Sequence, residues 1–591
     1  MTLEADALYA RALLQHAARR PEAALADCEA ILAGHPAHAE ALHLRGVALS
    51  ELRQTEEALA SYDRALACRP DYAEAHFNRG LVLATLGRFD GAVESFAAAL
   101  ALAPRVADIY VGRAEALEKL GRFEEAARDY DKAFALNPDC AWLCGARLFA
   151  KMRLCDWRTH KADLADLIVR VASGAKATPA LSSAAFADRP DIHRQAAALW
   201  TASEYPANPI LGPPPVRAQI GRIRIGYFSM DFREHPAARG AAVVLEGHDR
   251  TRFEVYAFSY GPNTGDAMRA RIEKAADHFF DVRGKSDTEV AQLARHLGID
   301  IAVDLAGHTH DARPGIFALR AASLQVTYLI YPMLAAYMDY AVIEERLLPK
   351  AQWSAYPEKM AVVPCLIPND RLRPAVETAT PRAQLQLPEE GVVFCGFNSS
   401  YKITPAMFDL WVRIVADVTE SVLWLGNMPA AAAANLRRAA AKRGVAPERL
   451  VFANYVSAEA HFARLRSADL FLDTFPFTAQ TTALDALWAG VPVVTLEGDS
   501  MPARGSASIV AAAGLLELVT HAPDTFIEVA VGLARHPARR VRLRVHLDAL
   551  RAHGALFEPE TYIKPLEAVL IAMITRHRAG LAPDHITVAA P

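Results

Sequence analysis

The sequence predicts an α-helical superhelix followed by two consecutive α/β domains, each built on a parallel sheet. Three observations support this fold class. Prolines recur every 34 residues in the first quarter of the chain, strand-like apolar runs alternate with helical segments after residue 216, and this alternation starts again near residue 390. A fixed period is typical of stacked repeats, and alternating strands and helices are typical of doubly wound sheets.

The repeat is clearest over residues 39–140, with a weaker copy over residues 5–38. Each unit has two amphipathic helical stripes joined by a short turn, which reads LGRF in two copies. Small residues occupy the positions where the two helices must approach closely, and proline marks the start of the next unit. The pattern resembles the tetratricopeptide repeat, whose superhelix binds peptides or partner proteins. The repeated prolines are Pro36, Pro70, Pro104 and Pro138.

Four regions follow from this pattern. We expect a repeat domain over residues 1–158, a helical linker with a proline-rich end over 159–215, and α/β domains over 216–380 and 381–591. Ligands of parallel sheets bind beyond the carboxyl ends of the strands, so two such domains in succession predict a cleft between them. No GxGxxG or GxxxxGK[ST] motif follows a strand, which argues against a dinucleotide dehydrogenase or a P-loop enzyme.

Composition narrows the function classes. The chain has 591 residues, 52% of them hydrophobic and 22% charged, with a formal net charge of −4. This excludes a mostly disordered chain and gives no indication of a nucleic-acid partner. No apolar stretch is long enough to cross a membrane, and the first residues lack a signal-peptide pattern. The seven cysteines form no CxxC motif, so we expect a cytoplasmic protein with reduced thiols and no membrane partner.

In the first α/β domain, two histidines follow predicted strands. His235 lies in SMDFREHP, where proline stiffens the loop and the imidazole could act as a general base or a hydrogen-bond donor. His308 lies in DLAGHT, which brings a carboxylate, a flexible glycine and polar groups into one turn. Either motif, taken alone, is weak evidence for a site.

In the second α/β domain, polar residues again follow strands. Asn398 and Lys402 lie in FNSSYKITP, and a lysine here could neutralise a phosphate or simply be a surface residue at a helix start. Thr481 and Thr482 open a predicted helix, whose free N–H groups and dipole favour a phosphate, although Thr481 could also be only an N-cap.

Two further residues of this domain fit a nucleotide. Asp485 lies about one turn inside the same helix, where its carboxylate could accept ribose hydroxyls. His461 lies on a preceding helix, where its ring could stack on a base or be an ordinary exposed histidine. Together the lysine, the helix N-terminus and the carboxylate outline a site for a nucleotide diphosphate without a metal.

The order of these motifs resembles the O-GlcNAc transferase / SPINDLY family of protein O-glycosyltransferases, from the repeats to about residue 580. The resemblance implies a GT-B fold of two Rossmann-like domains and an inverting, metal-independent reaction with no cofactor. It also implies a nucleotide-sugar donor, by default UDP-GlcNAc, and a Ser/Thr acceptor on a protein recruited by the repeats. The catalytic residues would be His235 and Lys402. The donor-binding residues would be His308, Asn398, His461, Gln480, Thr481, Thr482 and Asp485.

The sequence departs from the family pattern on the sugar and base side. Residues 330–336 read IYPMLAA in place of a glycine- and threonine-rich loop of the form GYPGTTG, and the loop is two residues shorter. Gln480 replaces a histidine, and Ala458 replaces a lysine. Two alternatives therefore stay open. One is a flagellin O-glycosyltransferase that uses a CMP-linked nonulosonic acid, and the other is a repeat adaptor whose catalytic half has decayed. The sequence leaves the oligomeric state open.

Overall fold

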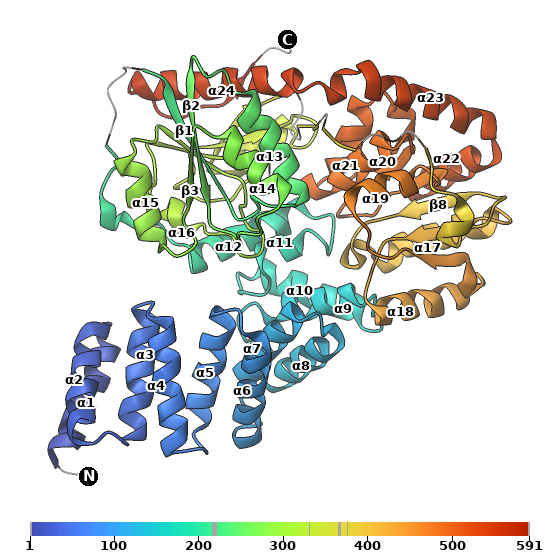
Figure 1. Ribbon diagram of the computed structural model, residues 1–591. Helices are drawn as coiled ribbons and strands as arrows, with labels where there is room; N and C mark the ends of the chain where they lie inside the picture. Colours follow the sequence, from blue (N-terminus) through green and yellow to red (C-terminus); the bar gives the residue numbers. More distant parts are fainter. Residues whose placement is uncertain are drawn as a thin grey trace. The chain divides into compact units, whose positions relative to one another are not determined.

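The computed structural model describes residues 3–588 except 216–220, 330, 365–367, 371, 375 and 377. The chain divides into two compact units, Met1–Leu154 and Cys155–Pro591. We describe them in turn, with the element labels of Figure 1. Among the described cysteines every thiol is free, and Cys365 lies outside the described residues.

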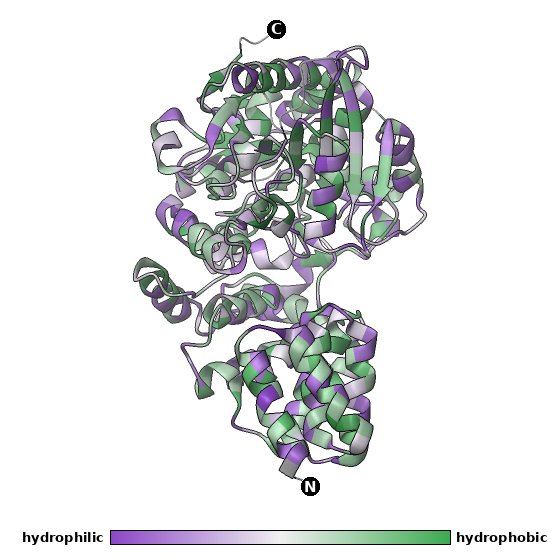
Figure 2. Ribbon diagram, turned by 90° about the vertical axis from the view of Figure 1, so that its left-hand side faces the viewer, coloured by the Kyte–Doolittle hydropathy of each residue, from purple (hydrophilic) through white to green (hydrophobic). Residues whose placement is uncertain are grey.

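The first unit consists of helices that pair as antiparallel hairpins, as the 34-residue period predicts. Gly46 shows why the period carries a small residue, because a Cβ there would lie 2.6 Å from the ring of Tyr62. Hydrophobic and hydrophilic residues are interspersed along these helices, as amphipathic packing requires (Figure 2). The helices are α1 (Leu3–Ala17), α2 (Pro21–Gly34), α3 (Ala39–Glu51), α4 (Thr55–Cys68), α5 (Ala73–Thr85), α6 (Phe89–Leu102), α7 (Ala107–Lys119), α8 (Phe123–Leu136) and α9 (Leu143–Arg153).

The second unit begins with three helices, α10 (His160–Ala172), α11 (Ala180–Ser183) and α12 (Pro190–Glu204). Polar contacts attach them to the α/β part of the same unit. The carboxylate of Asp188 accepts the backbone N–H groups of Asp499 and Ser500, both at 2.8 Å. The hydroxyl of Thr201 donates to the carbonyl of Met333 at 2.9 Å. The region predicted as a linker is therefore packed on the domains that follow it.

The first sheet has eight parallel strands in the order β14-β7-β6-β5-β4-β1-β2-β3. The last strand of the chain, β14, pairs with β7, so the end of the chain returns to this sheet. The predicted region 381–591 thus supplies elements to both sheets. The strands are β1 (Ile223–Ser229), β2 (Phe253–Ser259), β3 (His278–Asp281), β4 (Ile301–Asp304), β5 (Leu324–Thr327), β6 (Tyr340–Ile343), β7 (Lys359–Val362) and β14 (Ile586–Thr587). The helices are α13 (Pro236–Gly247), α14 (Ala267–Ala275), α15 (Asp287–His296), α16 (Gly315–Ala318) and α24 (Glu560–Arg578).

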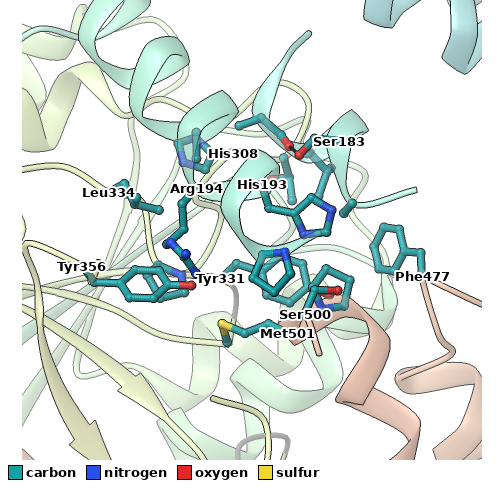
Figure 3. Close-up of a pocket in the computed structure, with 18 of the residues that line it drawn as sticks. Ser183, His193, Arg194, His308, Tyr331, Leu334, Tyr356, Phe477, Ser500 and Met501 are labelled. Atoms are coloured by element: carbon teal, nitrogen blue, oxygen red, sulfur yellow. Dashed lines mark hydrogen bonds between the residues drawn. The ribbon is translucent and has the colours of Figure 1, made fainter. Parts of the chain in front are cut away.

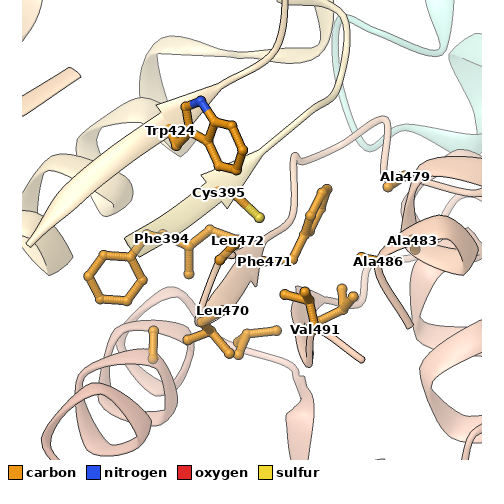
Figure 4. Close-up of a cluster of buried hydrophobic side chains, with 14 of the residues drawn as sticks. Phe394, Cys395, Trp424, Leu470, Phe471, Leu472, Ala479, Ala483, Ala486 and Val491 are labelled. Atoms are coloured by element: carbon orange, nitrogen blue, oxygen red, sulfur yellow. The ribbon is translucent and has the colours of Figure 1, made fainter. Parts of the chain in front are cut away.

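The second sheet has six parallel strands in the order β10-β9-β8-β11-β12-β13. Its central strands are buried on both faces, as parallel sheets require, and their side chains form a core that includes Phe394, Phe471 and Trp424 (Figure 4). The strands are β8 (Val393–Gly396), β9 (Val422–Leu425), β10 (Leu450–Phe452), β11 (Leu470–Leu472), β12 (Val493–Leu496) and β13 (Val519–Thr520). The helices are α17 (Pro405–Asp417), α18 (Ala430–Ala441), α19 (Ala458–Leu465), α20 (Thr481–Trp488), α21 (Met501–Ala512), α22 (Pro523–Arg535) and α23 (Pro537–His553).

The predicted fold class is confirmed: a repeat superhelix precedes two domains built on parallel sheets. None of the helices described is both long and apolar enough to span a membrane.

Candidate functional site

The N-terminus of α20 is the centre of the candidate site. Thr481 and Thr482 are the first two residues of this helix, and Gln480 precedes it without capping it through its side chain. The Gln480 amide instead donates to the hydroxyl of Tyr331 at 3.0 Å. Thr481 is therefore inside the helix and is not its N-cap. The first N–H groups of α20 have no intrahelical partner, which makes this end an anion-binding position.

Buried polar groups hold the loop that leads into α20. The Asp473 carboxylate, which is fully buried, accepts the N–H groups of Thr474 and Ala479 at 2.8 Å. The side-chain amide of Asn398 donates to the hydroxyl of Thr474 at 2.8 Å. Asn398 is itself buried and its amide oxygen has no hydrogen-bond partner. In this structure Asn398 therefore stabilises the loop that leads into α20 through its hydrogen bond to Thr474.

Lys402 brings a cation to the same loop. It ends a short 3₁₀ turn (Ser400–Lys402) that follows β8. Its ammonium donates to the carbonyl of Thr478 at 3.1 Å and lies 4.0 Å from the ring centre of Phe477. Burial lowers the pKa of Lys402 to about 8, and the nearby Asp473 opposes this shift. A second anion would stabilise the charged form, so the position favours a ligand with phosphate oxygens.

Asp485 lies on α20, and one of its carboxylate oxygens pairs with Arg373 at 2.8 Å. Burial raises the pKa of Asp485, while Arg373 and, from α13 across the cleft, Arg239 lower it. The Arg373 side chain is almost fully buried. The ion pair fixes the carboxylate in place and leaves its other oxygen as an acceptor for a hydroxyl pair.

His461 lies on α19 beside the same end of the second sheet. Its Nδ1 accepts hydrogen bonds from the Arg464 guanidinium at 3.0 and 3.2 Å, and its ring lies 5.3 Å from that of Phe397. Burial, followed by Arg464 and Arg239, lowers the pKa of His461 to about 4. The imidazole is therefore neutral at pH 7. A neutral, oriented aromatic ring is suited to stacking on a base.

His235 lies between β1 and α13, on the first sheet. Its Nδ1 is 3.3 Å from the N–H of Ala237, which donates to it, and 3.4 Å from a carboxylate oxygen of Asp231. Burial lowers the pKa of His235, and Asp231 opposes this shift. The side chain is 40% exposed. Its Nδ1 thus has a donor on one side and an acceptor on the other, so the imidazole can adopt either tautomer.

A cavity of about 290 Å³ lies between the two α/β domains (Figure 3). His308 and Gln480 line it, and so do Tyr401 and Phe477, which neighbour Lys402 in sequence or in space. His235 is not among the lining residues. The His308 Nε2 lies 3.0 Å from the carbonyl of Met333 and donates to it, whereas the buried Nδ1 has no partner. Burial lowers the pKa of His308 to about 4, so it offers a neutral acceptor.

The sequence did not indicate that α11 and α12 form one wall of this cavity. Ser183, His193 and Arg194 line it from these helices. The Arg194 guanidinium lies 5.8 Å from the ring of Tyr356, and no carboxylate of the described residues pairs with it. Both helices lie in the predicted linker. Their sequence alone does not indicate that their polar side chains contact a cavity formed by residues more than a hundred positions further along the chain. Arg373 was missed because it also meets its partner Asp485 from a distant segment, and Asp473 because a buried carboxylate after a strand resembles a ligand-binding one.

The architecture and site are those of a two-domain, parallel-sheet protein with an anion-binding helix terminus, preceded by tetratricopeptide repeats. Residues 209–367 and 371–566 match the family model of glycosyl transferase family 41, and residues 43–107 and 77–139 match a tetratricopeptide repeat model. Because the first match covers more than half of the chain, the chain belongs to glycosyl transferase family 41.

Curated relatives agree with the predicted resemblance. The chain is 34% identical over 385 residues to the probable UDP-N-acetylglucosamine–peptide N-acetylglucosaminyltransferase SEC of Arabidopsis thaliana, covering 63% of this chain and 39% of that protein. It is 28% identical over 485 residues to the corresponding Caenorhabditis elegans transferase, covering 62% and 42%. It is 26% identical over 402 residues to a tomato SPINDLY protein, covering 65% and 41%. The chain thus spans about two fifths of the length of these relatives.

A solved structure extends the likeness to nearly the whole chain. A single-residue mutant of the O-GlcNAc transferase from Thermobaculum terrenum is 28% identical, with a TM-score of 0.63 over 97% of this chain and 98% of that one. The resemblance to the O-GlcNAc transferase / SPINDLY family and the fold class are therefore confirmed.

Proposed function

We propose that this chain transfers a sugar from a nucleotide-sugar donor to a serine or threonine hydroxyl of a protein, with UDP-GlcNAc as the donor. The observation that carries the proposal is the uncapped N-terminus of α20 beside the Lys402 ammonium. The names of the relatives specify peptide N-acetylglucosaminyl transfer from UDP-N-acetylglucosamine, and we carry this chemistry over as a proposal.

The proposed donor site uses the residues of the second domain. The neutral ring of His461 stacks on the base, and the free oxygen of Asp485 accepts ribose hydroxyls. The diphosphate sits at the first N–H groups of α20, beside Thr481 and Thr482. The sugar then extends into the cavity, where His308 and Gln480 meet its hydroxyls.

Charge develops on the diphosphate when the bond to the sugar breaks. Lys402 and the N–H groups of α20 are fixed before the reaction, so they stabilise this charge without reorganising. These groups therefore take the role that a divalent cation plays in other enzymes, and the reaction needs no metal. Attack of the acceptor from the face opposite the diphosphate inverts the configuration of the sugar.

We assign His235 the role of the base that takes the proton of the acceptor hydroxyl. This role requires a free Nε2, so the ring proton must be on Nδ1 and point toward Asp231. Asp231, which lies 3.4 Å from Nδ1, is then the positioning residue that selects this tautomer over the one favoured by the N–H of Ala237. The acceptor protein is recruited in the cytoplasm by the predicted repeat domain, residues 1–158.

One observation favours a second donor class. Arg194 brings a guanidinium to a cavity whose other walls are largely apolar, with no carboxylate of the described residues beside it. A sugar that carries a carboxylate would pair with this group. That chemistry fits the predicted alternative of a CMP-linked nonulosonic acid, with flagellin as the acceptor. The comparisons do not favour this alternative, because the relatives are named for UDP-N-acetylglucosamine.

A thermal-shift panel tests the proposal, because a ligand that binds the folded state raises the melting temperature. UDP, UDP-GlcNAc, CMP and CMP-N-acetylneuraminic acid would each be added to the wild-type protein and to Asp485→Ala. The surface variant Glu528→Ala serves as the matched control. We expect UDP and UDP-GlcNAc to stabilise the wild type and the control but not Asp485→Ala. Stabilisation by CMP-N-acetylneuraminic acid that is lost in Arg194→Met would favour the second donor class. No response to any nucleotide would favour the decayed adaptor.

A further inference from the structure

We infer that Leu334 determines which sugar the cavity accepts, by packing against an apolar substituent of that sugar, and that Glu358 positions it. The inference rests on the proposed function, because it concerns the sugar that the cavity would hold. The altered loop comprises residues 330–336, of which residues 331–336 are described. This is the loop at which the sequence departs from the family pattern.

Leu334 has a backbone conformation that leucine rarely adopts. Its φ is +51°, in the left-handed region, where the side chain of an L-residue is crowded by the carbonyl that follows. Its side chain lines the cavity, together with the ring of Tyr356 and the side chain of Met501 (Figure 3). A glycine would adopt the same conformation without strain but would leave this part of the cavity open. A strained residue at a cavity wall is a candidate for a functional role.

Glu358 stabilises this conformation of the loop through hydrogen bonds to its backbone. It is fully buried just before β7, and its Oε1 accepts the N–H of Ala335 at 3.2 Å. Burial raises the pKa of Glu358 to about 7, and the backbone N–H groups of Ala335, Leu334 and Met333 oppose this shift. Successive N–H groups that surround one anion, with a left-handed residue among them, form a nest. Here the group at the centre is the carboxyl of Glu358 itself, so the nest fixes the loop and binds no ligand.

On its other side the loop is fixed by two hydrogen bonds to one of its own carbonyls, that of Met333. The oxygen of Met333 accepts from the Thr201 hydroxyl at 2.9 Å and from the His308 Nε2 at 3.0 Å. The second of these bonds keeps the ring proton of His308 on Nε2 and leaves Nδ1 as an unpartnered acceptor. The loop is therefore determined by contacts from α12, from the turn after β4 and from the segment before β7. These contacts place an apolar side chain and a hydrogen-bond acceptor in the same cavity.

This pair of groups selects a class of sugar. His308 Nδ1 can accept a sugar hydroxyl, and Leu334 provides an apolar surface for a methyl-bearing substituent such as an N-acyl group. A pocket that discriminates by one apolar group changes relative affinity by roughly 10- to 200-fold. We therefore expect an N-acylated sugar to be preferred over the same sugar with a hydroxyl in place of the N-acyl group.

Calorimetric titration of the full-length protein tests this with UDP, UDP-glucose and UDP-GlcNAc as the probes. The variants are Leu334→Gly, which removes both the strain and the side chain, and Leu334→Ala, which removes the side chain and keeps the strain. We expect both to bind UDP as the wild type does and to lose most of the preference for UDP-GlcNAc over UDP-glucose, by about tenfold. An unchanged preference in both variants, with UDP binding intact, would overturn the role of Leu334.

Glu358 is tested by two further variants. Glu358→Gln keeps an acceptor oxygen for the Ala335 N–H and should retain the preference, whereas Glu358→Ala should lose it while UDP binding persists. Equal retention by both variants would overturn the positioning role. If Glu358→Ala does not fold, the Leu334 variants still decide the main claim. Failure of the wild type to bind UDP at all would instead contradict the proposed function, so the two failures are distinguishable.

Discussion

Replacing Lys402 by methionine should raise the stability of the free protein while it removes activity. Burial lowers the pKa of Lys402 from its ordinary 10.5 to about 8. At pH 7 this shift means that the charged lysine destabilises the folded state by ~3 kcal/mol. The destabilisation is ~1–3 kcal/mol once partial contact of the side chain with solvent is allowed for. Methionine has a similar length and no charge. We therefore expect Lys402→Met to unfold at higher urea concentration than the wild type.

The pH dependence of this difference has a definite sign. Between about pH 8 and 10.5 the unfolded chain keeps the lysine proton that the folded chain has lost, so wild-type stability rises with pH across this window. The advantage of Lys402→Met over the wild type should shrink accordingly and be largely gone near pH 10.5. In the same variant the transfer rate should fall by roughly 10²- to 10³-fold, because a preorganised cation for the leaving diphosphate is missing.

Urea titrations of both proteins at pH 7 and pH 10, followed by circular dichroism and paired with transfer assays, measure both effects. A methionine variant that is less stable than the wild type at pH 7 would refute the reasoning. It would mean that the contacts of Lys402 with Thr478 and Phe477 outweigh the cost of its burial. A stability difference that is the same at both pH values would refute it as well.

Three further predictions follow from the same structure. Asp485→Asn, which keeps the shape of the side chain, should weaken UDP binding by about tenfold in calorimetry, since a charged acceptor for hydroxyls is worth ~1.5–3 kcal/mol; unchanged affinity would remove Asp485 from the nucleotide site. Gly46→Ala should destabilise the repeat unit by ~1–3 kcal/mol, because a Cβ would lie 2.6 Å from the Tyr62 ring, with UDP affinity as the unaffected control. The acid limb of the kcat/KM profile should lie below the ordinary histidine value of 6.5, because burial lowers the pKa of His235 and the base must be neutral; a limb above that value would contradict the assignment.

The sequence was sufficient to predict the features that depend on short-range pattern. The 34-residue period predicted the helical hairpins, because each repeat carries its own small residues, as at Gly46. The positions of Lys402, Thr481 and Asp485 after strands predicted that they outline one site, and in the structure Lys402 contacts the loop that leads into the helix carrying Thr481 and Asp485. The replaced loop was also recognised as unusual, and its Leu334 lines the cavity.

Other features depend on contacts between distant segments, which no local pattern encodes. The wall formed by α12 is one case, because Arg194 meets the cavity only after the chain has folded around it. The return of β14 to the first sheet is another, since two residues carry too little periodicity to predict a strand. The stabilisation by Asp473 of the loop that precedes α20 was also missed, because in sequence a structural carboxylate after a strand cannot be distinguished from a ligand-binding one. His235 does not line the cavity, and its catalytic role stays a prediction.

The most direct test of the account is transfer of labelled sugar to protein. Wild type and Lys402→Met would be incubated side by side with UDP-GlcNAc labelled in its sugar and with proteins extracted from the source cells, and protein-bound label would be measured. We expect label on protein with the wild type and a loss of at least about a hundredfold with Lys402→Met. Equal labelling by the two proteins, or none by a wild type that binds UDP-GlcNAc, would contradict it.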